Sequence, residues 1–358
     1  MRVPQYARRP LAAMALAGLM TGCGGGDTNA PDAPFDPAGT TSDLGAIQAS
    51  FESEAMAGFQ SAVPAISSVL GETPAAMAVR AAPSQALAGG RSGVRDYAGA
   101  VARVYTSPSG GMRPVSPSAT IAQEHLGVTF TRDAETLAYE ASARSGAPSN
   151  GVRFIVYAVN PISHEPVTPL QEVGYADLEV TQGTNGGSVR LELVSGGVTY
   201  LDYSVGATLT ENAMLLTVGG YVSNGQDRVN FDLDTELTET ALTLDYSLVV
   251  PTRGNFRMDF EEVVTNSGMT STLTVRGPHG TITIEGTQTT SGGSYQVEVN
   301  GAAFATITFT QGAEPVITGV DGEPLTEEEL DTLRDVFLMF LGGFDFFEDL
   351  LDPLSPAV

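Results

Sequence analysis

The chain of 358 residues contains no lysine and no tryptophan, and it has a single cysteine. All 17 of its basic residues are arginines, against 42 acidic residues, which gives a formal net charge of −25. A strongly acidic chain binds nucleic acid poorly, and Schiff-base, P-loop and Ser-Lys chemistries each need a lysine. These absences exclude nucleic acid as a partner and exclude those reaction classes.

The first 22 residues have the pattern of a secretory signal peptide. Three arginines precede an apolar run at 11–20, and small residues follow before Cys23. The apolar run is about ten residues long, which is too short to span a bilayer as a helix. We therefore expect residues 1–22 to be removed on export, as a signal peptide is.

The residues around Cys23 resemble the lipobox of bacterial lipoproteins, which places leucine or a similar residue three positions before an invariant cysteine. In this chain Met20 holds that position, with Leu19 just before it. The resemblance covers only the signal region, and it implies acylation of Cys23 and a stable lipid anchor. Because Gly24 stands where lipoproteins of the inner membrane typically carry Asp, the resemblance favours the outer membrane, on either its periplasmic or its surface side. The alternative is an ordinary secretory signal with an accidental cysteine.

Three segments of different composition precede the main domain. Residues 23–40 are rich in Gly, Pro and Asp and are predicted to form a flexible tether after the lipidated cysteine. Residues 41–71 have apolar side chains at three- and four-residue steps, which predicts an amphipathic helix that Pro64 kinks or divides. Residues 72–126 are predicted to be an Ala/Pro/Gly/Arg-rich linker with one candidate strand. The five arginines at 80–113 are either solvated loop charges or contacts for anionic lipid headgroups.

Residues 127–320 alternate between apolar and polar side chains in segment after segment. Val229, Phe231 and Leu233, for example, alternate with acidic and amide residues. Turn residues separate such runs at intervals of roughly ten to fourteen residues, which predicts about twelve to fifteen antiparallel strands. The dipeptides expected to form tight hairpins are Asn224-Gly225, Asn300-Gly301 and Asp321-Gly322.

We therefore predict a mainly β fold, in which a large antiparallel up-and-down meander curves into a half-barrel or an open barrel. A sheet this wide must curl, close or be covered. Residues 325–352 can supply the cover, because Thr326 and Glu329 form a capping box that starts a strongly apolar helix. We expect this C-terminal helix and the N-terminal helix to pack on the concave face of the sheet.

This architecture resembles the half-barrel lipoprotein carriers of the bacterial periplasm, whose curved sheet holds acyl chains under a helical lid. The resemblance implies that aromatic and aliphatic side chains of the sheet and the helix contact a ligand. The residues predicted to do so are Phe256, Met258, Phe260, Phe337, Phe340 and Phe344. Long alternating strands are also typical of a second fold, an integral outer-membrane barrel with its apolar face towards lipid.

Catalytic and metal-binding patterns are scarce. The three histidines, His125, His164 and His279, lie in separate turn or loop contexts with no metal-ligand spacing, and Gly277–Gly280 is predicted to be a turn rather than a site. We therefore predict no enzyme activity, no cofactor and no metal.

Two non-enzymatic functions remain, beside an enzyme that would need the few histidines or a pair of acidic residues to converge in one cleft. The first is a lipid-anchored envelope lipoprotein that binds a lipid or another hydrophobic ligand in a groove between curved sheet and helix. The alternative is a structural or interaction lipoprotein of the outer membrane with a solid core and no ligand.

Overall fold

The computed structural model describes residues 35–336, apart from 52, 70–120, 164, 184–185, 211–212, 239, 266, 290, 311–315 and 323. All of the described residues belong to one compact unit, Pro31–Val358. The predicted signal peptide, Cys23 and the arginine-rich stretch 80–113 lie outside the described residues. The same holds for Phe337, Phe340 and Phe344.

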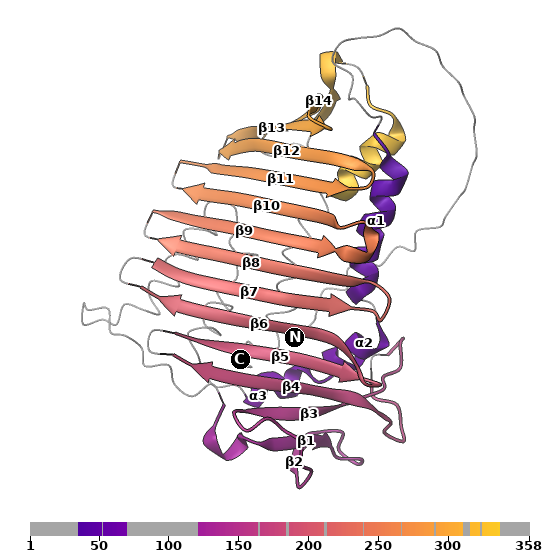
Figure 1. Cartoon of the computed structure of the whole chain (residues 1–358), viewed down its shortest axis with the longest axis vertical. Coiled ribbons are helices and arrows are strands. Elements are labelled where there is room, and N and C mark those ends of the chain that lie inside the picture. Colours follow the sequence, from indigo (N-terminus) through magenta and orange to yellow (C-terminus); the bar gives the residue numbers. More distant parts are fainter. Residues whose placement is uncertain are drawn as a thin grey trace. The chain divides into compact units, whose positions relative to one another are not determined.

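Fifteen strands form one sheet (Figure 1). From β3 to β15 each strand is hydrogen-bonded to the next in chain order, and β1 and then β2 follow on the other side of β3. Since β15 and β2 lie at opposite edges, the sheet is not closed. The bounds are β1 Val128–Arg132, β2 Tyr139–Ser142, β3 Gly151–Tyr157, β4 Glu172–Gln182, β5 Gly186–Ser195, β6 Val198–Leu209, β7 Ala213–Ser223, β8 Arg228–Thr238, β9 Ala241–Val250, β10 Phe256–Thr265, β11 Met269–Gly277, β12 Gly280–Thr289, β13 Gly292–Val299, β14 Ala302–Thr310 and β15 Val316–Gly319.

The predicted mainly β fold, built on one large antiparallel meander, is confirmed. One strand pair departs from it, because β1 and β3 run parallel, with Val128 opposite Val152 and Phe130 opposite Phe154. β2 pairs with β1 in a hairpin and forms the edge of the sheet. β3, the next strand in the chain, pairs with the opposite side of β1. The curvature into a half-barrel and the packing of the C-terminal helix stay predictions.

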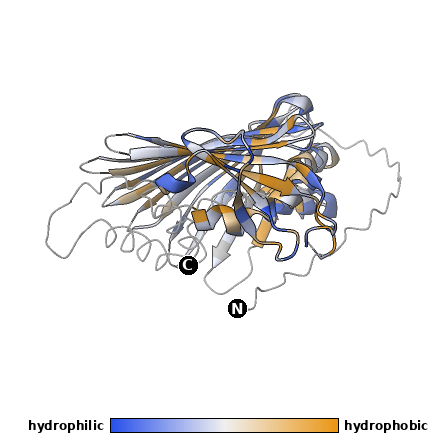
Figure 2. Cartoon of the chain, turned by 90° about the horizontal axis from the view of Figure 1, so that it is seen from below, coloured by the Kyte–Doolittle hydropathy of each residue, from blue (hydrophilic) through white to orange (hydrophobic). Residues whose placement is uncertain are grey.

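Alternation along the strands gives the sheet one buried face and one face towards water. In β8, Val229, Phe231 and Leu233 are buried, whereas Asp232 and Asp234 are exposed. Orange hydrophobic and blue hydrophilic segments accordingly follow one another along the strands (Figure 2). Buried apolar side chains from every strand between β3 and β14 belong to a single hydrophobic cluster, which forms the core.

The predicted hairpin turns are correct at two of three dipeptides. Asn300-Gly301 joins β13 to β14 with φ angles of 52° and 79°, the positive values that a tight primed turn requires. Asn224-Gly225 begins the turn between β7 and β8, in which Gly225 has a φ of 88°. The prediction for Asp321-Gly322 is wrong, because this dipeptide lies in the 3-10 helix η3, Val320–Gly322, after the last strand.

The N-terminal helical region consists of α1 Pro37–Phe51, α2 Glu54–Gln60 and α3 Val63–Val69. Ser53 caps α2, since its hydroxyl accepts a hydrogen bond from the backbone N–H of Met56 at 3.2 Å. As expected, the helical region is divided at its proline, because α2 ends at Gln60 and α3 begins at Val63, directly before Pro64. Pro64 is the second residue of α3, where the missing N–H costs no helical hydrogen bond.

Buried side chains of all three helices join the same cluster as the sheet, among them Leu44, Phe59 and Ile66. A further helix at 327–336 begins at the predicted capping box. Thr326 Oγ1 accepts from the N–H of Glu329 at 3.3 Å, and Glu329 Oε2 accepts from the N–H of Thr326 at 2.8 Å. Leu333 and Val336 of this helix are fully buried in the core.

Candidate functional site

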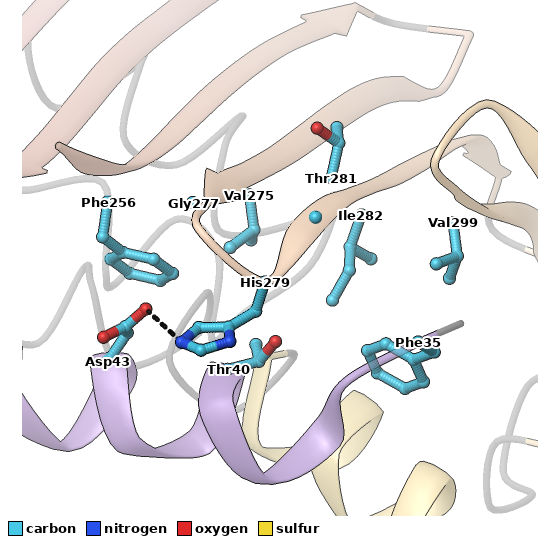
Figure 3. Close-up of a pocket in the computed structure, with 11 residues that line it drawn as sticks. Phe35, Thr40, Asp43, Phe256, Val275, Gly277, His279, Thr281, Ile282 and Val299 are labelled. Carbon is cyan, nitrogen blue, oxygen red and sulfur yellow. Dashed lines mark ion pairs between the residues drawn. The ribbon is translucent and has the colours of Figure 1, made fainter. Parts of the chain in front are cut away.

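A small pocket lies where the start of α1 meets the turn between β11 and β12 (Figure 3). Its volume is about 260 Å³ when the solvent-filled space at its opening is included. Apolar side chains from β10 to β13 line one part of it, and polar groups of α1 line the other. The side chains of Phe35, Asp43, Phe256, His279, Ile282 and Val299 line it.

His279 is the central polar group of this pocket. It belongs to the two-residue turn closed by Gly277 opposite Gly280, so the predicted turn is confirmed. From there the imidazole reaches α1 (Figure 3), where Nε2 lies 3.7 Å from Asp43 Oδ2. Its Nδ1 lies 2.6 Å from Oδ2 of Asp36, the residue before α1. Sequence reasoning missed both contacts, because their partners lie far away in the chain.

The two carboxyl groups beside His279 differ in environment. The Gly39 N–H donates to Asp36 Oδ1 at 3.0 Å and, together with the hydrogen bond to His279, holds the pKa of half-buried Asp36 below its usual value. Asp43 is buried, and its Oδ2 has no hydrogen-bond partner. Burial raises the pKa of Asp43, although His279 and Arg253 oppose that shift.

The described groups of this pocket that can exchange a proton are the imidazole of His279 and the neighbouring carboxyl groups. Its hydroxyl groups are those of Thr40 and Thr281, and Thr40 Oγ1 already donates to the carbonyl of Asp36 at 3.0 Å. Within the described ranges, no group of three or more His, Cys, Asp or Glu could hold a metal ion. The contacts therefore serve to fasten α1 to the β11–β12 turn.

A second polar position lies on the buried face, near the opposite ends of these strands. Glu262 of β10 is 1% exposed and lies in line with the buried residues Phe260 and Val264. Burial raises the pKa of Glu262 to about 7, against a smaller opposing effect of a hydrogen bond with Ser271. The signal was present in the sequence, because Glu261-Glu262 puts a carboxyl at an inward position of an otherwise apolar alternation.

Three of the six predicted ligand-contacting residues are described, and all three are in β10. Phe256, Met258 and Phe260 are buried on the apolar face, and Phe256 also lines the pocket. His125 stacks edge-on against Phe130, with ring centroids 5.5 Å apart, far from His279 in the sheet order. His164 lies outside the described residues.

No protein-family model, no curated protein and no solved structure matches this chain. Among the helices of the described segments, none combines the length and the apolar character needed to cross a membrane.

Proposed function

We propose that this protein is a lipid-anchored, non-enzymatic protein of the cell envelope that holds a lipid or other hydrophobic ligand on the apolar face of its sheet. In this proposal the sheet curves into a half-barrel and the apolar C-terminal helix lies in its concave face. The observation that carries the proposal is the continuity of the apolar face, since buried side chains from Val152 in β3 to Ile307 in β14 form one cluster.

The width of that face supports the proposal. Of the helices α1 to α3, α2 contacts β3, β4 and β5, and α1 contacts β7 and β8. Met258 and Phe260 of β10 lie beyond these strands on the same face. A broad apolar surface of this kind offers hydrocarbon contacts to a ligand, and each buried methylene contributes about 0.8 kcal/mol.

The burial of the apolar face and the small size of the pocket favour a second candidate, a structural or interaction lipoprotein with a solid core. Met258 and Phe260 are fully buried. The enclosed volume of the pocket is about 10 Å³, far below the roughly 300–1,000 Å³ of small-molecule sites. In this candidate the acidic, water-facing side of the sheet would contact protein partners, and no ligand would occupy the apolar face.

Ligand extraction separates the two candidates. The full-length protein, isolated from its native membranes, should release a hydrophobic molecule in native mass spectrometry, and the emptied protein should bind Nile red. Phe260→Leu should weaken Nile red binding because it removes a ring from the apolar face, whereas Val263→Ala on the water-facing side should not. If no molecule is released and the emptied protein leaves Nile red fluorescence unchanged, the solid-core candidate replaces the carrier.

The lipid anchor has its own test. The unaltered protein should fractionate with the outer membrane, and Cys23→Ala should release it from the membrane. Globomycin, which blocks lipoprotein signal cleavage, should cause the precursor to accumulate. A Cys23→Ala protein that stays membrane-bound, with no precursor accumulating under globomycin, would contradict the anchor.

A further inference from the structure

One carboxyl group interrupts the apolar face of the sheet. The buried positions along β10 are Phe256, Met258, Phe260, Glu262 and Val264. Glu262 lies opposite Leu244 of β9 on one side and opposite Ser271 of β11 on the other. An acidic side chain therefore occupies a place that the alternation reserves for an apolar one.

Glu262 has too few partners for a buried carboxyl group. Its Oε2 accepts a hydrogen bond from Ser271 Oγ at 3.2 Å, and its Oε1 is buried with no hydrogen-bond partner. The chain has no lysine, and none of the described arginines forms an ion pair with Glu262. Buried carboxylates in proteins are normally paired with a cation, because an uncompensated charge in the interior is strongly unfavourable.

Residues with hydroxyl groups lie in the same row of the sheet as this carboxyl group. Thr235, Glu262, Ser271 and Tyr295 belong to one row of residues that crosses the sheet from β8 to β13. The row passes through Gly286 of β12, where a Cβ atom would come within 2.7 Å of the Tyr295 ring. The absence of a side chain there leaves room for the ring to lie over β12 towards Ser271.

The surroundings of this polar row are apolar. Tyr246 and Phe260, in the next row, have ring centroids 5.1 Å apart, and Leu244 and Val264 are buried beside Glu262. The charge of Glu262 reaches both nearby phenols, and it raises the pKa of Tyr246 and of Tyr295 in addition to the larger effect of burial. A carboxyl group with hydroxyl neighbours in such a setting suits the polar end of an otherwise hydrophobic molecule.

We infer that Glu262 binds the ammonium head of a long-chain amine whose hydrocarbon part lies on the apolar face of the sheet. The inference rests on the proposed function and names its ligand class. An amine fits better than an alcohol, because Ser271 and the phenols already offer neutral hydrogen-bonding groups. What Glu262 lacks is a positive charge, and a primary ammonium group brings that charge and three N–H donors.

Displacement of Nile red by matched amphiphiles tests the inference. Dodecylamine and dodecanol share one hydrocarbon chain and differ in head group, and both are titrated at one ionic strength. The unaltered protein should bind dodecylamine about tenfold or more tightly than dodecanol, as expected for a charged hydrogen-bonded pair. Glu262→Gln should abolish this preference without weakening dodecanol.

Two further variants complete the design. Glu261→Gln removes a carboxyl group on the exposed side of the same strand, and it should keep the preference, which excludes attraction by the general negative charge of the protein. Glu262→Asp retains a carboxylate and should keep part of the preference, so it replaces Glu262→Gln as the decisive variant if the latter does not fold.

The outcomes separate the inference from the function on which it rests. If neither amphiphile displaces Nile red because nothing hydrophobic binds, the proposed function fails. If dodecanol and dodecylamine bind equally well, or if Glu262→Gln retains the preference for the amine, the ammonium site is wrong and the hydrophobic carrier stands.

Discussion

The two halves of the sheet treat the acidic side chains of their water-facing side differently. From β3 to β6 these acids have arginine partners. Arg153 contacts Asp177 with N···O distances of 2.6 and 2.7 Å, and its guanidinium lies 3.7 Å from the centre of the Tyr175 ring. Arg190 lies within ion-pair distance of Glu179, Glu192 and Asp202.

From β8 to β10 three of the acids face one another instead. Asp234 lies directly opposite Asp245, and Asp245 lies directly opposite Glu261. In the described part of the chain none of the three has an ion-pair partner. On the other face of β10, Glu262 is buried without a cation. The half that contains β10 thus carries uncompensated negative charge on its water-facing side, which attracts cations, whereas ion pairs across adjacent strands stabilise the first half.

The largest expected effect is the loss of the Arg153 pair. Arg153→Met leaves Asp177, which is 8% exposed, as a buried charge without its cation. The free energy of unfolding should fall by about 3 kcal/mol or more, measured by urea denaturation. The matched control is Arg257→Met, whose exposed pair with Asp259 should contribute about 0.5 kcal/mol or less. Equal losses in the two variants would remove the contrast between the halves.

The next effect is the pH dependence that Glu262 gives to stability. Its carboxyl ionises near 4.5 in the unfolded chain and near 7 in the folded one. The folded state therefore favours the protonated form, and this contribution to stability is complete below about pH 4.5 and is lost as pH rises through about 7. The nearby Tyr246 and Tyr295 stay neutral throughout this range, because their pKa values are raised.

Glu262→Gln should remove that dependence. Between about pH 5 and pH 8 the unaltered protein should lose about 2 kcal/mol more of its unfolding free energy than the variant does. Denaturation at several pH values measures the difference, and Glu261→Gln on the exposed side of β10 is the control that should follow the unaltered protein. Parallel pH profiles for all three proteins would mean that Glu262 is not held in an apolar environment.

The smallest effect concerns the row of like charges. Asp245→Asn relieves its repulsion with both Asp234 and Glu261, so the variant should be more stable by about 0.5–1 kcal/mol at low ionic strength. The gain should shrink in about 1 M salt, because salt screens exposed charges. Glu192→Gln in the paired half should not stabilise the protein. A gain there as large as that of Asp245→Asn would show that the pairing with Arg190 has no energetic effect.

The sequence predicts the strands well, because a strand with one buried face has an apolar side chain at every second residue. Val229, Phe231 and Leu233 were enough to identify β8 and its buried face. The parallel pair of β1 with β3 could not be predicted in the same way, since alternation reports which face is buried and not which strand lies beside which. The helix boundary at Ser53 was missed because an N-cap serine inside an amphipathic pattern resembles any other polar position.

The residues of the candidate sites also divide into those that local alternation predicts and those whose contacts depend on distant parts of the chain. Phe256 and Met258 were correctly expected to face the core, which follows from alternation alone. The contacts of His279 with Asp36 and Asp43 depend on how α1 crosses the ends of distant strands, and no local pattern reports that. Glu262 lies between these cases, because its position in the alternation was visible although its lack of a cation was not.

The edges of the sheet set how the chain behaves next to copies of itself. The strands at the two edges, β2 and β15, have only four residues each, whereas several strands between them have ten or more. A strand of a neighbouring chain could form only a few backbone hydrogen bonds with either edge strand. Short edge strands are one of the devices by which natural sheets avoid polymerising. Many copies can therefore crowd together without joining their sheets into a fibre.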